Sequence, residues 1–262
     1  MDTYHNFDEI KSAFSDFYDL TKKKVVINEE DIGKIWDSKE EKVITFGFTN
    51  KAKLCAKDVK EKQGKYSFDC YFENKKLFRV KLNVLGKHNI VNALACIALS
   101  LEYKIPLKKI KFGLESFQGV KRRAEVIKQG DVTFYCDYAH HPTEIKSTLS
   151  TLRLITKGRL IAIFQPHTYS RTLSLMAQFK TCFNEADCLI ILPTYSAREK
   201  RIEGGDATDL FFNLDKKISS QYVSNFDALS FELNNLLKPN DICVFIGAGD
   251  IYNIALKYVE RV

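Results

Sequence analysis

The sequence lacks the cysteine patterns of a disulfide scaffold or of a zinc-binding domain. Its seven cysteines are odd in number and scattered, and none forms a C-x-x-C pair. Most of them lie inside apolar runs, where a reduced cysteine behaves as a small buried hydrophobe. We therefore expect free core cysteines in a cytoplasmic protein, without disulfides or structural zinc.

Long apolar runs are also missing. A membrane-spanning helix needs about 18 to 20 apolar residues in succession, and the first residues carry Asp2, Asp8 and Glu9 where a signal peptide would be basic and then apolar. The net charge of +7 comes from 40 basic and 33 acidic residues spread along the chain, which is typical of a solvated surface. We expect no membrane and no nucleic acid among the partners, whereas a small anionic substrate is compatible.

The third absence is the phosphate-binding loop G-x-x-x-x-G-K-[ST]. Gly-Lys pairs begin at Gly33, Gly64 and Gly86, but none has a glycine five places earlier. In nucleotide-binding proteins that loop cradles phosphates with its backbone amides. The sequence therefore excludes this way of holding nucleotide phosphates within these residues.

The first part of the chain predicts an α/β arrangement with a β-hairpin. Apolar residues at steps of three and four indicate an amphipathic helix with a stripe of Phe7, Phe14 and Phe17, which must be buried against something. Alternating residues then indicate strands, and helical periodicity returns before a joint at Gln118 and Gly119. The predicted elements are a helix over 7–17, strands at 25–28 and 43–48, a hairpin with strands 68–72 and 78–84, and helices at 89–103 and up to 117.

From residue 130 short β-rich apolar runs alternate with helical patterns. Five such βα units predict a doubly wound, mostly parallel sheet of five to six strands. We thus predict two domains, 1–119 and 120–262. The predicted strands are 132–136, 159–164, 188–193, 221–224 and 241–246, and the predicted helices are 142–155, 171–185, 206–215, 226–237 and 250–260.

Polar side chains and glycines gather where four of these five strands end. In such sheets ligands bind outside the carboxyl ends of the strands, because helix amino termini and loops converge there. This convergence predicts the functional site better than any single motif. The clusters are Asp137, Tyr138, His140 and His141; Gln165, His167, Tyr169 and Arg171; Thr194, Tyr195, Ser196, Arg198 and Glu199; and Gly247, Gly249 and Asp250.

Each cluster also has a structural interpretation. His140 and His141 precede Pro142, a good first residue of a helix, so they could be ordinary loop residues. Together with Asp137 and His167 they could instead hold zinc or manganese, although consecutive histidines usually point in different directions. Arg171 opposes the dipole near a helix start, which favours contact with a ligand.

A second candidate lies upstream, in the segment GKHNIVNALA. Asn89 and Asn92 stand three apart at a predicted helix start, where asparagine often serves as an N-cap. If Asn89 caps the helix, Asn92 and His88 are left to face a ligand.

These segments together resemble the Mur ligase family. The motifs GKHNIVNALA, FQGVKRRAEV, DYAHHPTEI, FQPHTYSRT, YSAREK and GAGDI occur in the family's order between about residues 86 and 250. The pattern is most similar to that of the UDP-N-acetylmuramate:L-alanine ligases, and the murein tripeptide ligases are also similar.

The resemblance implies an ATP-driven amide synthesis with Mg2+ in peptidoglycan precursor assembly. UDP-N-acetylmuramate, L-alanine and ATP would be the ligands, and an acyl phosphate the intermediate. It also implies that the phosphate loop, most Mg2+ ligands and a UDP-binding domain belong to N-terminal parts that precede this chain, in cis or in trans. The chain would then be the end of a central ATP-binding domain followed by an amino-acid-binding domain, inactive alone.

By resemblance, the motif residues take individual roles. Matches to ATP contacts are Asn89, Asn92, Arg123 and Asp137; matches to alanine contacts are Tyr138, His140 and Arg171; His88 and His167 line the site. His140 and Arg171 are the candidate catalytic residues, and no metal ligand is assigned.

Two positions depart from the family pattern, with Ala124 in place of an aromatic residue and Thr168 in place of arginine. Two further functions stay open, a binding module for ATP or an amino acid and a metal-dependent hydrolase.

Overall fold

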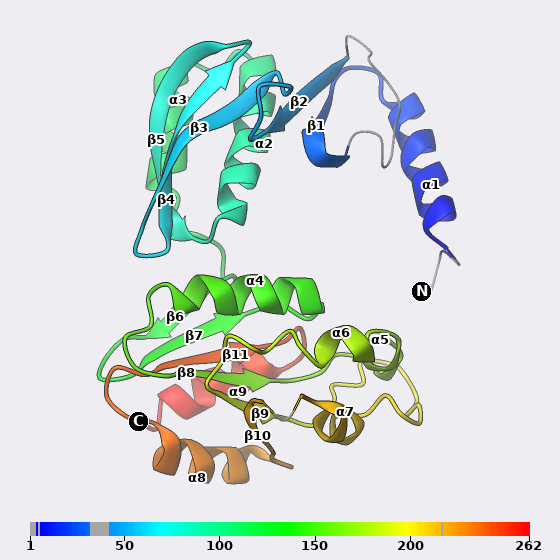
Figure 1. Ribbon diagram of the computed structural model, residues 1–262, viewed down its shortest axis with the longest axis vertical. Coiled ribbons are helices and arrows are strands. Elements are labelled where there is room, and N and C mark those ends of the chain that lie inside the picture. Colours follow the sequence, from blue (N-terminus) through cyan, green and yellow to red (C-terminus); the bar gives the residue numbers. More distant parts are fainter. Residues whose placement is uncertain (1–3, 5, 32–41, 216) are drawn as a thin grey trace. The chain divides into compact units, whose positions relative to one another are not determined.

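The computed structural model describes residues 4, 6–31, 42–215 and 217–262, and the chain divides into two compact units, Met1–Gln118 and Gly119–Val262 (Figure 1). Each unit is an α/β fold with its own sheet and its own hydrophobic core. No helix among the described residues is long and apolar enough to cross a membrane.

The first unit contains a mixed sheet in the order β1-β2-β3-β4-β5. Strands β1 to β3 run parallel, and β3, β4 and β5 are antiparallel neighbours. The predicted hairpin is confirmed as β4 and β5, and its turn places Glu73 and Asn74 at φ values of 46° and 65°. The elements are β1 (Val25–Asn28), the 3-10 helix η1 (Glu29–Asp31), β2 (Val43–Gly47), β3 (Leu54–Lys62), β4 (Lys65–Phe72) and β5 (Lys75–Leu85).

Helices α2 (His88–Glu102) and α3 (Leu107–Ser116) cover this sheet. Ile90, Leu94 and Ile97 on α2 are fully buried in one cluster with strand residues such as Phe68 and Val80. The apolar spacing that predicts the helix is therefore the spacing that fills the core.

Helix α1 (Phe7–Leu20) is confirmed, but its apolar stripe is exposed in the part of the chain that the structure describes. Asn6 caps the helix by accepting a hydrogen bond from the Glu9 amide. Phe14 and Phe17 retain 48% and 69% of their accessible surface, and the buried residue of the helix is Tyr18.

The second unit contains a six-stranded sheet in the order β10-β9-β8-β11-β7-β6. All neighbours run parallel except the edge strand β6, which is antiparallel to β7, and this confirms the mostly parallel, doubly wound arrangement. The strands are β6 (Glu125–Lys128), β7 (Thr133–Asp137), β8 (Leu160–Phe164), β9 (Cys188–Ile191), β10 (Ser219–Tyr222) and β11 (Ile242–Ile246).

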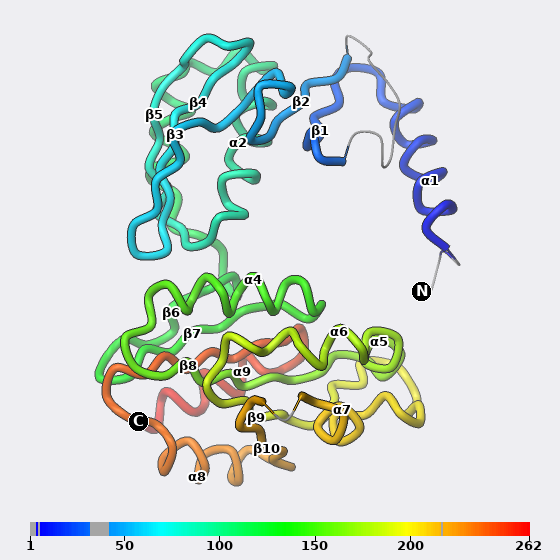
Figure 2. Tube along the Cα trace, in the orientation of Figure 1, coloured from blue at the N-terminus to red at the C-terminus, as the bar shows by residue number. Residues whose placement is uncertain are grey.

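Helices cover both faces of this sheet (Figures 1 and 2). The predicted helix 171–185 is wrong in two respects. The chain departs from helical backbone at Leu175 (φ −108°, ψ 13°) and forms two short helices, and the second of them ends at Phe179. The helices are α4 (Pro142–Arg153), α5 (Tyr169–Ser174), α6 (Met176–Phe179), α7 (Ala207–Asn213), α8 (Phe226–Leu236) and α9 (Ile251–Val259).

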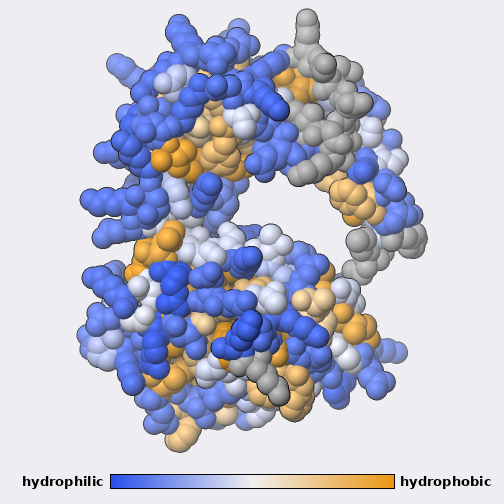
Figure 3. Space-filling view, viewed as in Figure 1, coloured by the Kyte–Doolittle hydropathy of each residue, from blue (hydrophilic) through white to orange (hydrophobic). Residues whose placement is uncertain are grey.

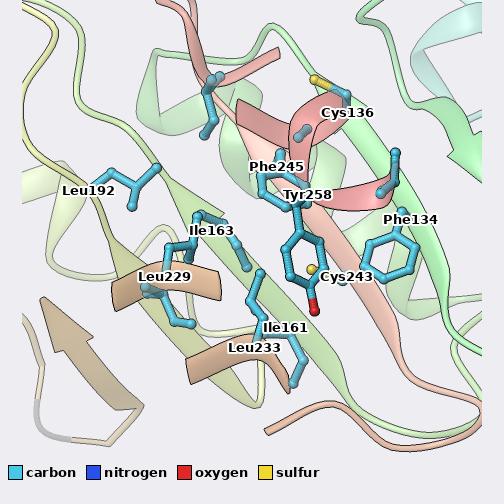
Figure 4. Close-up of a cluster of buried hydrophobic side chains, with 14 of the residues drawn as sticks. Phe134, Cys136, Ile161, Ile163, Leu192, Leu229, Leu233, Cys243, Phe245 and Tyr258 are labelled. Atoms are coloured by element: carbon cyan, nitrogen blue, oxygen red, sulfur yellow. The ribbon is translucent and has the colours of Figure 1, made fainter. Parts of the chain in front are cut away.

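The core of the second unit lies on both sides of the central strands. On one side Ile163 and Phe245 pack with Leu229 of α8 and Tyr258 of α9 (Figure 4). On the other, Phe164 contacts Phe179 and Phe183 with ring centroids 5.6 and 5.1 Å apart. Because the central strands are buried on both faces, their carboxyl ends form a rigid edge.

The cysteines and the surface agree with the composition. All seven cysteines are free, and all except Cys96 are buried. Polar side chains cover most of the visible face of both units, with smaller apolar patches between them (Figure 3).

Candidate functional site

Four aromatic rings from three strand ends form a continuous row. Tyr138 and His140 follow β7, His167 follows β8, and Tyr195 follows β9. Successive ring centroids are 5.4, 6.1 and 5.5 Å apart, and His167 and Tyr195 stack with an interplanar angle of 23°. The structure thus brings these predicted site residues together at the carboxyl edge of the sheet.

The two adjacent histidines have different contacts. The His141 side chain accepts a hydrogen bond from the Thr143 amide, and the Glu144 carboxylate accepts from the amides of His140 and His141, so that α4 begins with a capping box at Pro142. His140 instead lies 3.0 Å through Nδ1 from the Tyr138 carbonyl oxygen. A carbonyl oxygen only accepts, so Nδ1 carries the proton of this hydrogen bond, and in the neutral imidazole Nε2 is then the acceptor.

Arg171 is paired with His167 on the first turn of α5. Its Nη1 donates to His167 Nδ1 and to the His167 carbonyl oxygen, both at 3.1 Å. Burial, the Arg171 cation and then His140 lower the pKa of His167, and Glu199 opposes them. A neutral His167 therefore accepts from Arg171, while in the described part of the chain Nη2 and Nε of Arg171 have no hydrogen-bond partner.

The start of α5 is fixed by Glu199 from the loop after β9. Its carboxylate accepts from the amides of Tyr169 and Ser170 and from the Ser170 hydroxyl. An anion at this helix end offsets the unfavourable position of Arg171. Thr168, which precedes the helix, has a φ of 67°, a backbone conformation that residues other than glycine rarely adopt.

Asp137 is 6% exposed, and its carboxylate holds backbone of its own unit. Oδ1 accepts from the Ala139 amide at 2.8 Å and Oδ2 from the Ala124 amide at 2.7 Å. Burial raises the pKa of Asp137, and these two amides partly offset the effect. Arg123 is exposed beside this segment, with its guanidinium 5.4 Å from the Tyr138 ring centroid.

Arg122, which was not predicted from the sequence, connects the loops at this edge. Its Nη2 donates to the carbonyl oxygens of Gly247 and Gly249 at 3.1 and 3.0 Å, and its guanidinium lies over the rings of Tyr138 and Tyr252. The available signal was the doubled arginine in FQGVKRRAEV.

A pocket of about 320 Å³ opens beside Tyr195 at the same edge of the sheet. Gln165 and Asp250 lie in it and are joined by a hydrogen bond of 2.7 Å from Nε2 to Oδ1. The predicted clusters after β8, β9 and β11 contribute to this pocket, whereas the cluster after β7 is not in its lining and the end of β10, where no cluster was predicted, contributes Ser224 and Asn225. The lining residues are Gln165, Leu192, Pro193, Thr194, Tyr195, Ser196, Ser224, Asn225, Phe226, Leu229, Asp250 and Ile254.

In the first unit the candidate residues lie at the start of α2. The helix begins at His88, so Asn89 is not its N-cap; Asn89 donates to the Leu85 carbonyl oxygen at 2.7 Å and accepts from Asn92 Nδ2 at 3.0 Å. His88 and Asn92 are exposed, and His88 Nε2 lies 3.3 Å from Asn89 Nδ2.

The metal interpretation finds no support in the geometry of the described residues. Among them, no three or more His, Cys, Asp or Glu side chains are arranged to hold a metal ion. His141 is used as a helix cap, and both oxygens of Asp137 accept from amides. The histidines of this edge therefore do not form a zinc or manganese site together.

The pairing of His167 with Arg171 predicts a lowered pKa for the His167 imidazole. In an NMR pH titration, we expect the His167 imidazole to titrate below the ordinary value of about 6.5, because both burial and the cation disfavour its protonated form. Arg171→Ala should raise this pKa, whereas Arg198→Ala, which removes an exposed arginine nearby, should not. An unchanged titration in Arg171→Ala would contradict the pairing.

Both units match known families. Residues 1–100 match the Mur ligase middle domain, and residues 122–249 match the domain described as Mur ligase, glutamate ligase domain. The UDP-N-acetylmuramate--L-alanine ligase of Clostridium acetobutylicum is 36% identical over 269 residues, which cover 100% of this chain and 58% of the relative. That of Clostridium tetani is 40% identical, over 96% of this chain and 57% of the relative.

Solved structures give the same result for the fold. The crystal structure of UDP-N-acetylmuramate-alanine ligase MurC from Thermotoga maritima matches with a TM-score of 0.76 at 25% identity, over 98% of this chain and 55% of that one. MurF from Acinetobacter baumannii matches with the same TM-score at 18% identity, which shows the fold alone. The chain thus spans less than two thirds of the length of these relatives.

Proposed function

Because this chain belongs to the Mur ligase family, we propose that it provides the amino-acid-binding domain and part of the ATP-binding domain of a UDP-N-acetylmuramate:L-alanine ligase. The observation that carries the proposal is the row of Tyr138, His140 and His167 with Arg171 beside it, in a chain 36–40% identical to ligases of that name. A cytoplasmic location is part of the proposal.

The reaction requires two successive displacements. The lactyl carboxylate of UDP-N-acetylmuramate attacks the γ-phosphorus of ATP, and ADP leaves. The alanine nitrogen, after losing a proton, attacks the carbonyl carbon of the acyl phosphate, and phosphate leaves from the tetrahedral intermediate. Catalysis of this kind depends mainly on position and on neutralising charge on phosphoryl oxygens.

We assign the alanine end to Arg171, His140 and Tyr138. The unbonded Nη2 and Nε edge of Arg171 fits the alanine carboxylate, because a guanidinium binds a carboxylate through two parallel hydrogen bonds. In its neutral form His140 presents an acceptor at Nε2, which suits the amino group as it gives up a proton. His167 lines the site and orients Arg171.

The ATP end is assigned to Asn89 and Asn92 in the first unit and to Arg123 and Asp137 in the second. Asn92 is exposed and held by Asn89, so its amide is available to a ligand at a fixed position. Arg123 is exposed and can reach an anion. Asp137 contributes by fixing the Ala124 amide, while direct contact with nucleotide stays a prediction.

Magnesium accompanies ATP in reactions of this class and neutralises charge on the transferred phosphoryl group. Among the described residues no three or more His, Cys, Asp or Glu side chains are arranged to hold a metal ion, and a Mg2+ ion bound to nucleotide takes only one or two carboxylates besides phosphates and water, so its protein ligands form no such group. We therefore assign no Mg2+ ligand to this chain, and the sequence has no phosphate loop.

Two related functions remain alternatives. One is a binding module for ATP or an amino acid, which would bind without turnover. The other is a murein tripeptide ligase, because the motifs of this sequence resemble those of that group as well.

A chimeric ligase tests the proposal. Its first part would be the portion of the Clostridium acetobutylicum ligase outside the matched region, and its second part this chain. We expect phosphate release that requires both UDP-N-acetylmuramate and L-alanine, with the alanyl product seen by mass spectrometry. The chain alone, without a phosphate loop, should release none.

The outcomes separate the alternatives. A folded chimera that binds ATP and L-alanine but releases no phosphate would favour the binding module. A chimera that uses the tripeptide L-alanyl-γ-D-glutamyl-diaminopimelate in preference to L-alanine would favour the murein tripeptide ligase. The intact ligase of Clostridium acetobutylicum is the positive control.

A further inference from the structure

We propose that Arg122 is a positioning residue that holds the segment 122–124, the Tyr138 ring and the loop between β11 and α9 in one arrangement. This proposal deepens the proposed function and rests on it for its catalytic consequence. Arg123, assigned to ATP, and Tyr138, assigned to alanine, are both attached to structure that Arg122 contacts. Arg122 itself touches neither ligand in this proposal.

The Arg122 side chain joins parts of the chain that are distant in sequence. One nitrogen, Nη2, donates to the carbonyl oxygens of both Gly247 and Gly249. The guanidinium carbon lies 4.6 Å from the Tyr138 ring centroid and 5.6 Å from that of Tyr252. The cation therefore fixes two aromatic rings and the loop of residues 247–250 between β11 and α9, called the glycine loop below.

The Arg122 backbone is also held by hydrogen bonds on both sides, through its amide and its carbonyl oxygen. Its amide donates to Glu125 Oε2 at 2.7 Å, and its carbonyl oxygen accepts from the Tyr138 amide at 2.6 Å. Arg122 and Ala124 have φ values of 61° and 45°, a backbone conformation that residues other than glycine rarely adopt. Such a conformation persists only where several contacts impose it, and Asp137 supplies a further one through the Ala124 amide.

The contacts of Arg122 require a guanidinium. Its Nε is buried and forms no hydrogen bond in the described structure, so one edge of the group is desolvated without compensation. A guanidinium can donate twice from one terminal nitrogen, as Nη2 does here, while its planar face stacks on a ring. A lysine ammonium has no planar face to place over Tyr138.

The glycine loop links this arrangement to the pocket. The Gly247 amide donates to the Asp137 carbonyl oxygen at 3.0 Å. A side chain at Gly249 would meet Gln165 Oε1 and the Tyr195 ring, each 2.5 Å from the added carbon. A shift of this loop would consequently disturb the aromatic row through Tyr195 and through Tyr138.

Hydrogen–deuterium exchange of the chain, with Arg122→Lys and Arg122→Ala, tests the positioning. We expect amides in 137–141 and 246–252 to exchange about tenfold faster in both variants, with the rest of the second unit little changed. Arg159→Lys is the matched control, because Arg159 also clamps a carbonyl oxygen and a carboxylate, those of Leu236 and Asp241. Its effects should not reach these two segments.

The catalytic consequence is measured in the chimeric ligase. Arg122→Lys should lower kcat/KM for L-alanine about tenfold, and guanidinium ions should restore part of the activity of Arg122→Ala but none in Arg159→Ala. Uniform exchange across the unit, or no rescue in an active chimera, would overturn the proposal. A chimera inactive with Arg122 intact would instead count against the proposed function, and the exchange of the chain would still decide the positioning.

Discussion

Arg171→Ala in the chimeric ligase is expected to reduce kcat/KM for L-alanine by about 10²–10³-fold, since removing one charged group that binds the reacting substrate typically has an effect of this size. Two effects act together. The alanine carboxylate loses its cationic partner, and His167 loses the donor at Nδ1 that fixes its ring. The measurement is steady-state phosphate release against L-alanine concentration.

Two controls make the Arg171 result specific. Arg171→Lys keeps the charge but not the fork, so it should recover only part of the loss. Arg198→Ala removes an exposed arginine from the loop after β9 and should change kcat/KM little. If Arg171→Ala kept a normal Michaelis constant for L-alanine, the assignment of the carboxylate to Arg171 would be wrong.

The parts of the fold that the sequence predicted are those with strong local patterns. Continuous apolar runs such as 159–164 and 241–246 match the buried strands β8 and β11, and the alternation over 68–84 matches the hairpin. Strand β3 was not predicted, because after Leu54, Cys55 and Ala56 its residues are mostly charged and, from Asp58 on, exposed. Pairing with β4 along its length, and with β2 at Leu54 and Cys55, makes that segment a strand in the absence of a sequence pattern.

The candidate site divides in a similar way. Parallel strands bring their carboxyl ends to one edge, so the proximity of His140, His167 and Tyr195 could be predicted from topology. The different contacts of His140 and His141 depend on Glu144 and on the helix start, and the sequence left them open. Arg122 was missed because it binds the backbone carbonyl oxygens of Gly247 and Gly249, which are more than a hundred positions away in the sequence. Every residue has a backbone carbonyl group, so such a contact leaves no signal in a sequence.

Gly247→Ala is expected to destabilise the second unit by about 1–3 kcal/mol, the range for forcing an extra methyl into packed structure. The added carbon would lie 2.8 Å from the Gln165 carbonyl oxygen and 3.3 Å from Ile251 Cγ2, and the φ of 155° is itself unfavourable for alanine. The backbone at Gln165 cannot easily move, because its amide donates to the Ile246 carbonyl oxygen. Chemical denaturation measures the change.

Gly130→Ala is the matched control for Gly247→Ala in the same unit, because the nearest atom to its added carbon is 4.0 Å away. It should leave stability within about 0.5 kcal/mol of the parent. If the two substitutions had equal effects, the close approach of the glycine loop to β8 would not constrain the sequence. With unequal effects as expected, Gly247 is required by packing at the strand ends, and the position of its carbonyl oxygen, which Arg122 binds, follows from the same constraint.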